Sequence, residues 1–500
     1  MSPFKSQTFF NSPIVIFIIS SIVPLAIVLG DIYHGRIAFW FDPARDLLLG
    51  LHNLVSPTLI GQPSGIPGIF YGPYWIWLIS LITLVSEDPR TVAFLLLTIP
   101  YFTIFPIFLY KISKQWGIFI FISLWLIFIL NFTGYASQIW NVNYAPLFLS
   151  IAIYFGINSE SYSNRKRMFY FFLTGLSIGL ASNFHLSFGI PAILGFIVYF
   201  LINHMHMVET KKLSTTMSLY FFGVAFSFLP FFLFELRHNF IQTKIFLNAL
   251  TNSVVYNTAV VGQTGMNDNE IFTYFFGRFS HLLGIRADFA MIFLILLLVV
   301  VVFRIILKKS QVSNIDRRLV VLILSISISL LLIFIFNRNP IWNYYFIGVE
   351  ILFALFLGFA VHMLSIGKYV LIVFVCISLF ARQNELRNLF TKNDFKVTDL
   401  GTQIHIVQTV FNDSETNFFY HAYNPAIYTY EYDYLFKWLG NNYSKKIVSD
   451  SPLVYLIIPK VNSSTEKDFI NYKTSGQNYE QLNVIDFPDG TKVYKFKRTK

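Results

Sequence analysis

Long apolar runs, separated by short polar segments, dominate the first three-quarters of the chain. The runs that are candidates to cross a membrane lie at residues 12–30, 91–110, 118–134, 144–157, 168–184, 187–203, 215–234, 289–307, 319–336, 344–362 and 368–381. A helix needs about 20 predominantly apolar residues to cross a bilayer. We therefore predict about eleven transmembrane helices. The first is an anchor, because it lacks the small-residue cleavage signature of a signal peptide.

The pattern changes after residue 381, where no apolar run is long enough to span a membrane. The remaining segments predict strands at 417–422, 453–458, 482–487 and 492–497, and helices at 398–411, 428–440 and 464–472. The predicted fold class is an α-helical polytopic membrane domain over residues 1–381, with about eleven transmembrane helices plus juxtamembrane helices. A small soluble α/β domain follows over residues 382–500.

Composition indicates that a bilayer surrounds most of the chain. Hydrophobic residues make up 55% and charged residues 13% of the 500 residues, whereas an ordinary globular chain carries about 25% charged residues. These values exclude a cytosolic enzyme and a disordered chain. The single cysteine, Cys376, lies in an apolar run, which excludes a disulfide framework and a cysteine-ligated zinc site.

The net charge of +11 would indicate a nucleic-acid partner in a soluble protein, but here the bases gather in alternate loops. If the apolar run 70–86 does not cross and the N-terminus is cytoplasmic, most Lys and Arg residues of the membrane domain fall on the cytoplasmic side, as the positive-inside rule requires. We therefore predict no nucleic-acid partner. Segment 70–86 is predicted to be a juxtamembrane or re-entrant piece on the outer face, with Tyr71, Tyr74, Trp75 and Trp77 at the interface.

This topology places loops 31–90 and 235–288, and the C-terminal domain, on the extracytoplasmic side of a plasma membrane. Loops held by a rigid scaffold carry function, and the first contains a cluster of charges. Asp42, Arg45 and Asp46 begin a predicted amphipathic helix. In one interpretation Asp42 is an N-cap, Arg45 pairs with lipid phosphate and Asp46 is a solvated acid. In the other, a carboxylate is a general base beside a guanidinium that binds phosphate.

Two segments of this loop, FDPARD at 41–46 and YGPYWIW at 71–77, resemble the integral-membrane GT-C glycosyltransferases. The likeness is strongest to the branch that contains protein O-mannosyltransferases and lipid A aminoarabinose transferases. The resemblance implies that Asp42 matches the family's catalytic Asp and Arg45 the Arg that follows it, with Pro43 in place of the usual Glu. It also implies a GT-C-like membrane fold and a polyprenyl-phosphate-sugar donor.

The chain departs from the family's pattern at two further places. Tyr71, Gly72 and Pro73 stand where a charged residue and two prolines are usual. The family often has a second Asp in the outer loop after the third crossing, where this chain carries Asn141 and Asn143. Neutral amides are weaker ligands for hard cations than carboxylates are. We therefore predict a reaction that uses no divalent metal and no other cofactor.

A second cluster of charges opens the loop 235–288, where Glu235, Arg237, His238 and Lys244 follow the seventh crossing. One interpretation is an ordinary interfacial charge cluster. The other is a donor site, in which Arg237, His238 or Lys244 binds the donor phosphate and Glu235 binds an acceptor hydroxyl or pairs with Arg237. A polar stretch later in the loop is a candidate lid, and it contains Gln263, Asp268 and Glu270.

Two polar residues near the outer ends of apolar runs are weaker candidates. His185 follows the fifth crossing and is either a hydrogen-bonded helix-end residue or a catalytic group. Glu350 lies well inside an apolar run, where an acid is costly and therefore a functional candidate. Arg338 is a candidate partner for Glu350 or a second phosphate ligand.

The sequence thus predicts a membrane enzyme that moves a sugar from a polyprenyl-phosphate donor to a hydroxyl of a lipid, glycan or protein acceptor on the outer face, with inversion. Asp42 is the predicted general base, and Arg45, Arg237 and Lys244 are the predicted phosphate ligands. Acceptor-side or supporting candidates are Asp46, Tyr71, His185, Glu235, His238 and Glu350. Two alternatives remain open: a transporter or flippase for a lipid-linked saccharide or small molecule, and a non-catalytic envelope protein.

Overall fold

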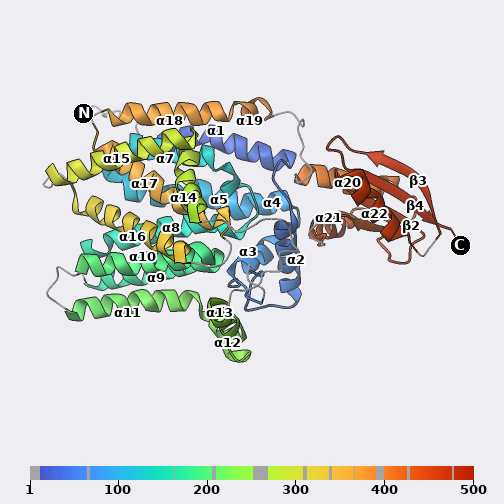
Figure 1. Ribbon diagram of the computed structural model, residues 1–500, viewed down its shortest axis with the longest axis horizontal. Helices are drawn as coiled ribbons and strands as arrows, with labels where there is room; N and C mark the ends of the chain where they lie inside the picture. The colour runs from blue at the N-terminus through green and yellow to red at the C-terminus, as the bar shows by residue number, and fades with distance from the viewer. Residues whose placement is uncertain are drawn as a thin grey trace, which may run out of the picture.

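The computed structural model describes residues 12–64, 68–162, 164–204, 210–251, 268–307, 312–336, 341–364, 366–389, 399–424, 428–475 and 478–499. Its apolar helices run side by side in one bundle, and a small soluble domain sits at one end of that bundle (Figure 1). The predicted fold class, a polytopic helical membrane protein with a C-terminal α/β domain, is confirmed.

Each predicted apolar run is helical, because the polar backbone of a segment in lipid must satisfy its hydrogen bonds internally. The helices of these runs are α1 (Pro13–His34), α4 (Pro89–Ala93), the π-helix η2 (Phe94–Thr98), α5 (Ile99–Phe102), α6 (Ile104–Ser113), α7 (Ile118–Asn131), α8 (Ala145–Asn158), α9 (Asn164–Phe184), α10 (Leu186–His204), α11 (Thr210–Ser227), α12 (Leu229–Arg237), α15 (Ala287–Leu307), α16 (Asn314–Phe336), α17 (Val349–His362) and α18 (Gly367–Ala381). Short 3₁₀ turns join several of them, namely η3 (Lys114–Trp116), η4 (Thr133–Ala136), η5 (Asn141–Tyr144), η6 (Ser159–Ser161) and η7 (Asn343–Phe346).

Six segments of the described chain are long and apolar enough to cross a membrane on their own, which makes this a multi-pass membrane protein. They are Pro13–His34, Pro89–Trp116, Leu186–Asn203, Ala287–Arg304, Asn314–Phe336 and Asn343–His362. The predicted crossing at 215–234 differs from expectation, because α11 and α12 meet at an angle of 64°. Pro230 at the start of α12 explains the break, since proline suits the first turn of a helix but not its interior.

Two helices of the first predicted outer loop lie between the bundle and the soluble domain (Figure 1). Helix α2 (Phe41–Val55) is the predicted amphipathic helix, and α3 (Tyr74–Thr83) packs against it. Helix α3 has 10 residues, about 15 Å of helix, which is half of a hydrocarbon core about 30 Å thick. This length agrees with the prediction that segment 70–86 does not cross.

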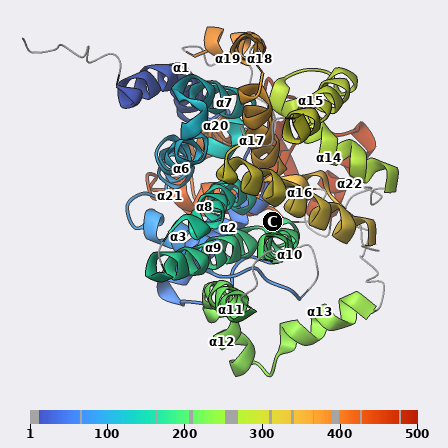
Figure 2. The ribbon, with the colours of Figure 1, turned by 90° about the vertical axis from the view of Figure 1, so that its left-hand side faces the viewer.

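The second predicted outer loop contains helices of its own, α13 (Ile241–Thr251) and α14 (Asp268–Leu283). Helices α12 and α13 lie at the margin of the bundle in both views (Figures 1 and 2). Helix α14 instead packs against the core helices α7, α16 and α17. The two parts of this loop therefore have different environments.

The soluble domain follows α19 (Gln383–Arg387) and matches the predicted order of elements. It comprises α20 (Leu400–Asp413), β1 (Phe419–Ala422), α21 (Tyr430–Gly440), β2 (Leu453–Ile458), α22 (Ser463–Thr474), β3 (Tyr479–Asp486) and β4 (Lys492–Arg498). The strands form one sheet in the order β1-β2-β4-β3. The β1–β2 pair is parallel, and β4 is antiparallel to both neighbours.

The soluble domain is tied to the end of α1 by close backbone contacts. Gly35 ends α1 with a φ of 70°, and its carbonyl accepts a hydrogen bond from the Gly401 N–H at 2.9 Å. A side chain at Gly35 would lie 2.6 Å from the Gly401 nitrogen, so glycine is required there both for its conformation and for this approach. Helix α21 packs against α2. The soluble domain therefore rests on the helix that carries the first predicted site.

Candidate functional site

The charged residues at the start of α2 form one connected cluster. Helix α2 begins at Phe41, and Trp40 occupies the cap position without a side-chain cap bond. The predicted N-cap role of Asp42 is therefore wrong. The Asp42 carboxylate instead pairs with Arg45, at 2.7 Å between Oδ1 and Nη1, because three residues along a helix bring two side chains to one face. Its Oδ2 accepts a longer bond of 3.3 Å from Trp40 Nε1.

Asp46 holds the other side of the same guanidinium. Its Oδ1 accepts bonds from Nε and Nη2 of Arg45 at 2.9 and 2.7 Å, and its Oδ2 accepts one from Trp75 Nε1 at 2.8 Å. Asp46 is fully buried, so the prediction of a solvated acid is wrong. Trp75 is also buried rather than at the interface. Burial raises the pKa of Asp46 to about 6, although Arg45 opposes the shift.

Asp42 and Arg45 line a cavity of about 380 Å³ between the bundle and the soluble domain. Their side chains are 23% and 13% exposed, so both can meet a ligand. Six aromatic residues and five polar or charged residues line the cavity; the lining comprises Phe41, Asp42, Arg45, Gln62, Pro63, Ser64, Tyr71, Trp140, Asn141, Val142, Tyr344, Tyr428 and Tyr430. Aromatic walls with a few placed polar groups are typical of small-molecule sites.

Tyr71, predicted as a supporting residue, belongs to this cavity. Burial and the neighbouring Tyr345 and Asp42 raise the pKa of Tyr71, so its hydroxyl stays protonated and can donate a hydrogen bond. Asn141 also lines the cavity, and its Nδ2 donates to the Phe184 carbonyl at 2.5 Å. Phe70 is tied to α13 by the bond from its N–H to Gln242 Oε1 at 2.6 Å.

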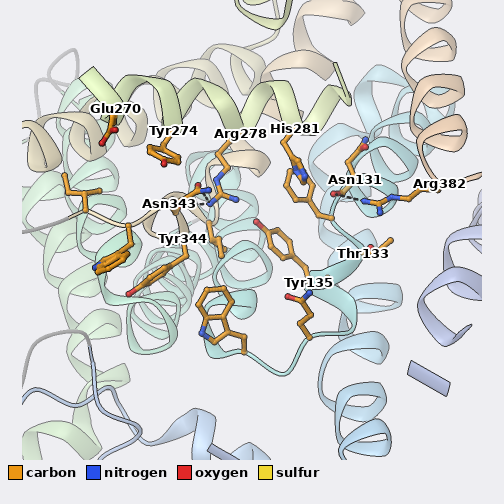
Figure 3. A pocket seen from close by; sticks show the side chains of 17 residues that line it. Asn131, Thr133, Tyr135, Glu270, Tyr274, Arg278, His281, Asn343, Tyr344 and Arg382 are labelled. Atoms are coloured by element: carbon orange, nitrogen blue, oxygen red, sulfur yellow. Dashed lines mark hydrogen bonds between the residues drawn. The ribbon is translucent and has the colours of Figure 1, made fainter. Parts of the chain in front are cut away.

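A larger cavity of about 920 Å³ adjoins the first, and Trp140 and Tyr344 line both. One face of α14 provides its polar wall, with Glu270, Tyr274, Arg278 and His281 directed toward the same space (Figure 3). Arg382 lies on the far side, where its guanidinium donates to the Leu130 carbonyl at 2.7 Å. The volume falls within the range of about 300–1,000 Å³ that is usual for ligand sites.

Glu350 forms a buried ion pair beside this larger cavity. It lies in the first turn of α17, where its Oε2 accepts a bond from the Gly348 N–H at 2.7 Å. Its Oε1 lies 3.0 Å from Arg278 Nη1 and accepts a 2.8 Å bond from Tyr135. Arg278 also donates to the carbonyl of Asn343 at 2.5 Å and to its side-chain oxygen at 2.9 Å, but its buried Nε has no partner. Glu350 thus orients a guanidinium whose buried Nε–H is free to bind a ligand.

His185 lies outside the lining of both cavities but contacts a residue that they share. It is buried, and its Nε2 lies 3.0 Å from the Tyr344 carbonyl. Burial lowers the pKa of His185 to about 3, so the ring is neutral at physiological pH. These contacts favour the helix-end interpretation of His185 over a catalytic one.

The structure does not bring the Glu235 cluster to either cavity. Glu235 is buried and caps α13, accepting bonds from the backbone of Gln242 and from Thr243 at 3.1 and 2.8 Å. Arg237, His238 and Lys244 are exposed on α12 and α13 and line neither cavity. This placement favours the interpretation as an interfacial cluster, and the phosphate-binding role of Arg237 and Lys244 finds no support in it.

The remaining predicted groups have mixed outcomes. Glu270, from the predicted lid, lines the larger cavity as part of α14. Gln263 and Arg338 lie outside the described residues.

In the described part of the chain no group of three or more His, Cys, Asp and Glu side chains is placed to share a metal ion. Metal independence remains a prediction.

Sequence reasoning missed several residues that the fold brings to the cavities. Arg278 is the most important, and the signal was present: Tyr274, Arg278 and His281 recur at helical spacing within an amphipathic stretch, so they share one face. Tyr428 and Tyr430 come from the soluble domain and carry no such signal, because only the tertiary fold brings them to the cavity.

These features define a class: a multi-pass membrane protein whose two adjoining polar cavities lie at the end of the bundle that carries a soluble domain. Two solved structures share this fold. ArnT from Cupriavidus metallidurans matches in the apo state with a TM-score of 0.61, and ArnT bound to undecaprenyl phosphate matches with a TM-score of 0.59. In both cases identity is 11%, over 96% of this chain and 97% of that chain. The predicted resemblance to the GT-C glycosyltransferases is confirmed at the level of fold.

Other comparisons add nothing to this likeness. Arabinosyltransferase EmbB from Mycobacterium smegmatis matches over 69% of this chain and 30% of that chain, at 11% identity and a TM-score of 0.39, which is too low to carry an argument. No protein-family model and no curated protein matches the sequence.

Proposed function

We propose that this protein is a membrane glycosyltransferase, which moves a sugar from a polyprenyl-phosphate donor to an acceptor hydroxyl with inversion at the anomeric carbon. Asp42, at the wall of a cavity in an ArnT-like fold, is the observation that carries the proposal. The likeness extends over nearly the whole of both chains and includes the form of ArnT that is bound to undecaprenyl phosphate. A lipid of that class is therefore the proposed donor carrier.

Arg278 is the proposed ligand of the donor phosphate. Its Nε–H is buried without a partner, and both Arg278 and Arg382 line the larger cavity. A phosphate oxygen would supply the missing acceptor through a charge-assisted hydrogen bond.

The proposed role of Arg45 differs from the phosphate-binding role predicted from the sequence. Asp42 and Asp46 engage three of its N–H groups, so Arg45 orients Asp42.

The sugar of the donor would then extend past Trp140 and Tyr344 into the smaller cavity, where Asp42 lies. The acceptor oxygen attacks the anomeric carbon as the bond from that carbon to the phosphate oxygen breaks. The acceptor proton passes to Asp42 Oδ2, whose bond to Trp40 is long at 3.3 Å. Polyprenyl phosphate leaves with the bonding electron pair, and attack opposite to it inverts the anomeric carbon.

The test is turnover by Asp42→Asn. The purified protein is given radiolabelled undecaprenyl-phosphoryl monosaccharides and a lipid and glycan extract of the source cells as acceptor. General-base help contributes about 10²–10⁴ in rate, so Asp42→Asn is expected to lose at least a hundredfold in turnover.

Asp468→Asn is the matched control, because Asp468 is exposed on α22 and lines neither cavity. It should keep wild-type turnover. Full turnover by Asp42→Asn would remove Asp42 from the mechanism. Failure of the wild-type protein to transfer sugar from this donor class would remove the proposed function itself.

A further inference from the structure

Gln62 has an unusual environment for a buried amide. It lines the smaller cavity and is 1% exposed, and neither its Oε1 nor its Nε2 has a hydrogen-bond partner. Its backbone is well fixed, because its carbonyl accepts a bond from Tyr71 N at 3.0 Å and Pro63 pairs with Phe70. Buried polar groups are almost always satisfied, so an exception at a cavity wall indicates a group that a ligand completes.

Two tyrosines from the soluble domain line the same cavity. The rings of Tyr428 and Tyr430 are parallel, with an interplanar angle of 5° and centroids 5.3 Å apart. Tyr428 is 55% exposed although it is large and aromatic. The chain therefore keeps an open aromatic surface at the cavity that also holds Gln62 and Asp42.

We propose that Gln62, Tyr428 and Tyr430 form the subsite that recognises the transferred sugar. The Gln62 amide binds ring hydroxyls of that sugar, and the two tyrosine rings cover its apolar C–H face. This inference rests on the proposed function and extends it, because it assigns the selection of the sugar to a loop of the membrane domain and to the soluble domain together.

The chemistry of the amide favours a hydroxylated ring over the other parts of the substrates. A glutamine amide offers two donors and an acceptor, and a pair of hydroxyls offers the same in return. A phosphate presents acceptors only, which would leave Gln62 Oε1 unsatisfied. A prenyl chain presents no polar group and would leave both amide atoms unsatisfied.

The first arm of the test is the thermal stability of Gln62→Met without ligand. Methionine is similar in length and has no strong hydrogen-bonding group, so the substitution removes an unsatisfied buried amide. We expect the Tm of the ligand-free full-length protein to stay equal to or rise above that of wild type. A structural role for Gln62 would instead lower the Tm. Gln408→Met, at an exposed position on α20, is the control.

The second arm measures binding to the full-length protein in nanodiscs. The probes are undecaprenyl phosphate and its glucose, galactose, mannose and arabinose phosphodiesters. Wild type should bind at least one sugar-bearing probe more tightly than undecaprenyl phosphate. Gln62→Met should weaken that binding about tenfold and leave the Kd for undecaprenyl phosphate unchanged. Tyr428→Leu, at a position that is 55% exposed, should act in the same direction.

Each result leads to a definite conclusion. Equal affinity of Gln62→Met and wild type for the preferred sugar-bearing probe overturns the proposal, as does a lower Tm for the ligand-free variant. Weakening of the sugar-bearing and sugar-free probes by the same factor also overturns it, because the effect would then act on the lipid phosphate. If wild type binds none of the probes, the proposed function fails, and the subsite falls with it.

Discussion

At the scale of single residues, the site depends on one guanidinium held between two carboxylates that differ in burial. Asp42 faces the cavity, whereas Asp46 is fully buried behind Arg45. Burial raises the pKa of Asp46 from 3.8 to about 6. The folded protein therefore takes up a proton between about pH 6 and pH 4 that the unfolded chain does not. Ionisation of the buried Asp46 carboxyl therefore lowers the free energy of unfolding above about pH 6. This destabilisation disappears as the pH falls toward 4.

The same titration should appear in catalysis. Protonation of Asp46 weakens its hold on Arg45, which orients Asp42, so wild-type turnover is expected to fall as the pH decreases through about 6. Asp46→Asn fixes this position in a neutral form and should be less active at neutral pH, without an acid limb near pH 6. A pH profile of kcat for both proteins measures this. An unchanged acid limb in Asp46→Asn would show that another group causes it.

At the scale of elements, the position of the site depends on how closely α2 packs on α3. Gly50 allows this approach, because a Cβ at that position would lie 2.3 Å from Cγ2 of Ile79. Ser80 reinforces the contact by donating to the Gly50 carbonyl at 2.9 Å and accepting from Asn53 Nδ2 at 3.0 Å. The bond between Asp46 and Trp75 spans the same two helices. Displacement of α2 would therefore disturb the charged cluster.

Gly50→Ala tests this packing. Overpacking a tight contact costs about 1–3 kcal/mol of stability, so the variant should have a lower Tm. Turnover should also fall, because displacement of α2 from α3 would break the bond between Asp46 and Trp75. Gly277→Ala is the matched control, because no atom lies within 4 Å of the added methyl on α14. That substitution should stabilise the helix by up to about 1 kcal/mol. Equal Tm values for the two variants would contradict the close-packing argument.

The elements were largely predictable from the sequence, and the site was predictable only in part. Long apolar runs identified the helices of the membrane domain, and apolar or alternating runs identified the strands of the soluble domain, because both patterns are local. The predicted number of about eleven crossings is not established, because six segments of the described chain are long and apolar enough to cross on their own. The FDPARD segment identified Asp42 and Arg45 in the same way. The bond between Trp75 and Asp46 and the ion pair between Arg278 and Glu350 join segments far apart in sequence, so no local pattern reveals them.

At the scale of the whole molecule, the soluble domain is part of the site. Helix α21 packs against α2, and Tyr430 at its start lines the smaller cavity. Tyr434 on the same helix is buried, packs against Phe39 with ring centroids 6.2 Å apart, and donates a 2.5 Å bond to the Glu87 carbonyl. The two domains therefore meet through a packed aromatic contact, which holds one wall of the cavity in place.

Tyr434→Ala is expected to loosen this junction. Replacing a buried aromatic residue by alanine costs about 3–5 kcal/mol, so hydrogen exchange in α2 and α21 should become faster and turnover should fall. Tyr434→Phe removes only one hydrogen bond, worth about 1 kcal/mol, and should have a much smaller effect. If Tyr434→Ala leaves exchange in α2 unchanged, the soluble domain does not support the site.

We propose above that a polyprenyl phosphate binds with its phosphate at Arg278 and presents its sugar to Asp42. The most direct test is an electron cryomicroscopy map of the protein in nanodiscs containing undecaprenyl phosphate. We expect phosphate density in contact with Arg278 in the larger cavity, with the path past Trp140 and Tyr344 open toward Asp42. Phosphate density at the opposite end of the bundle, or lipid density that avoids both cavities, would contradict it.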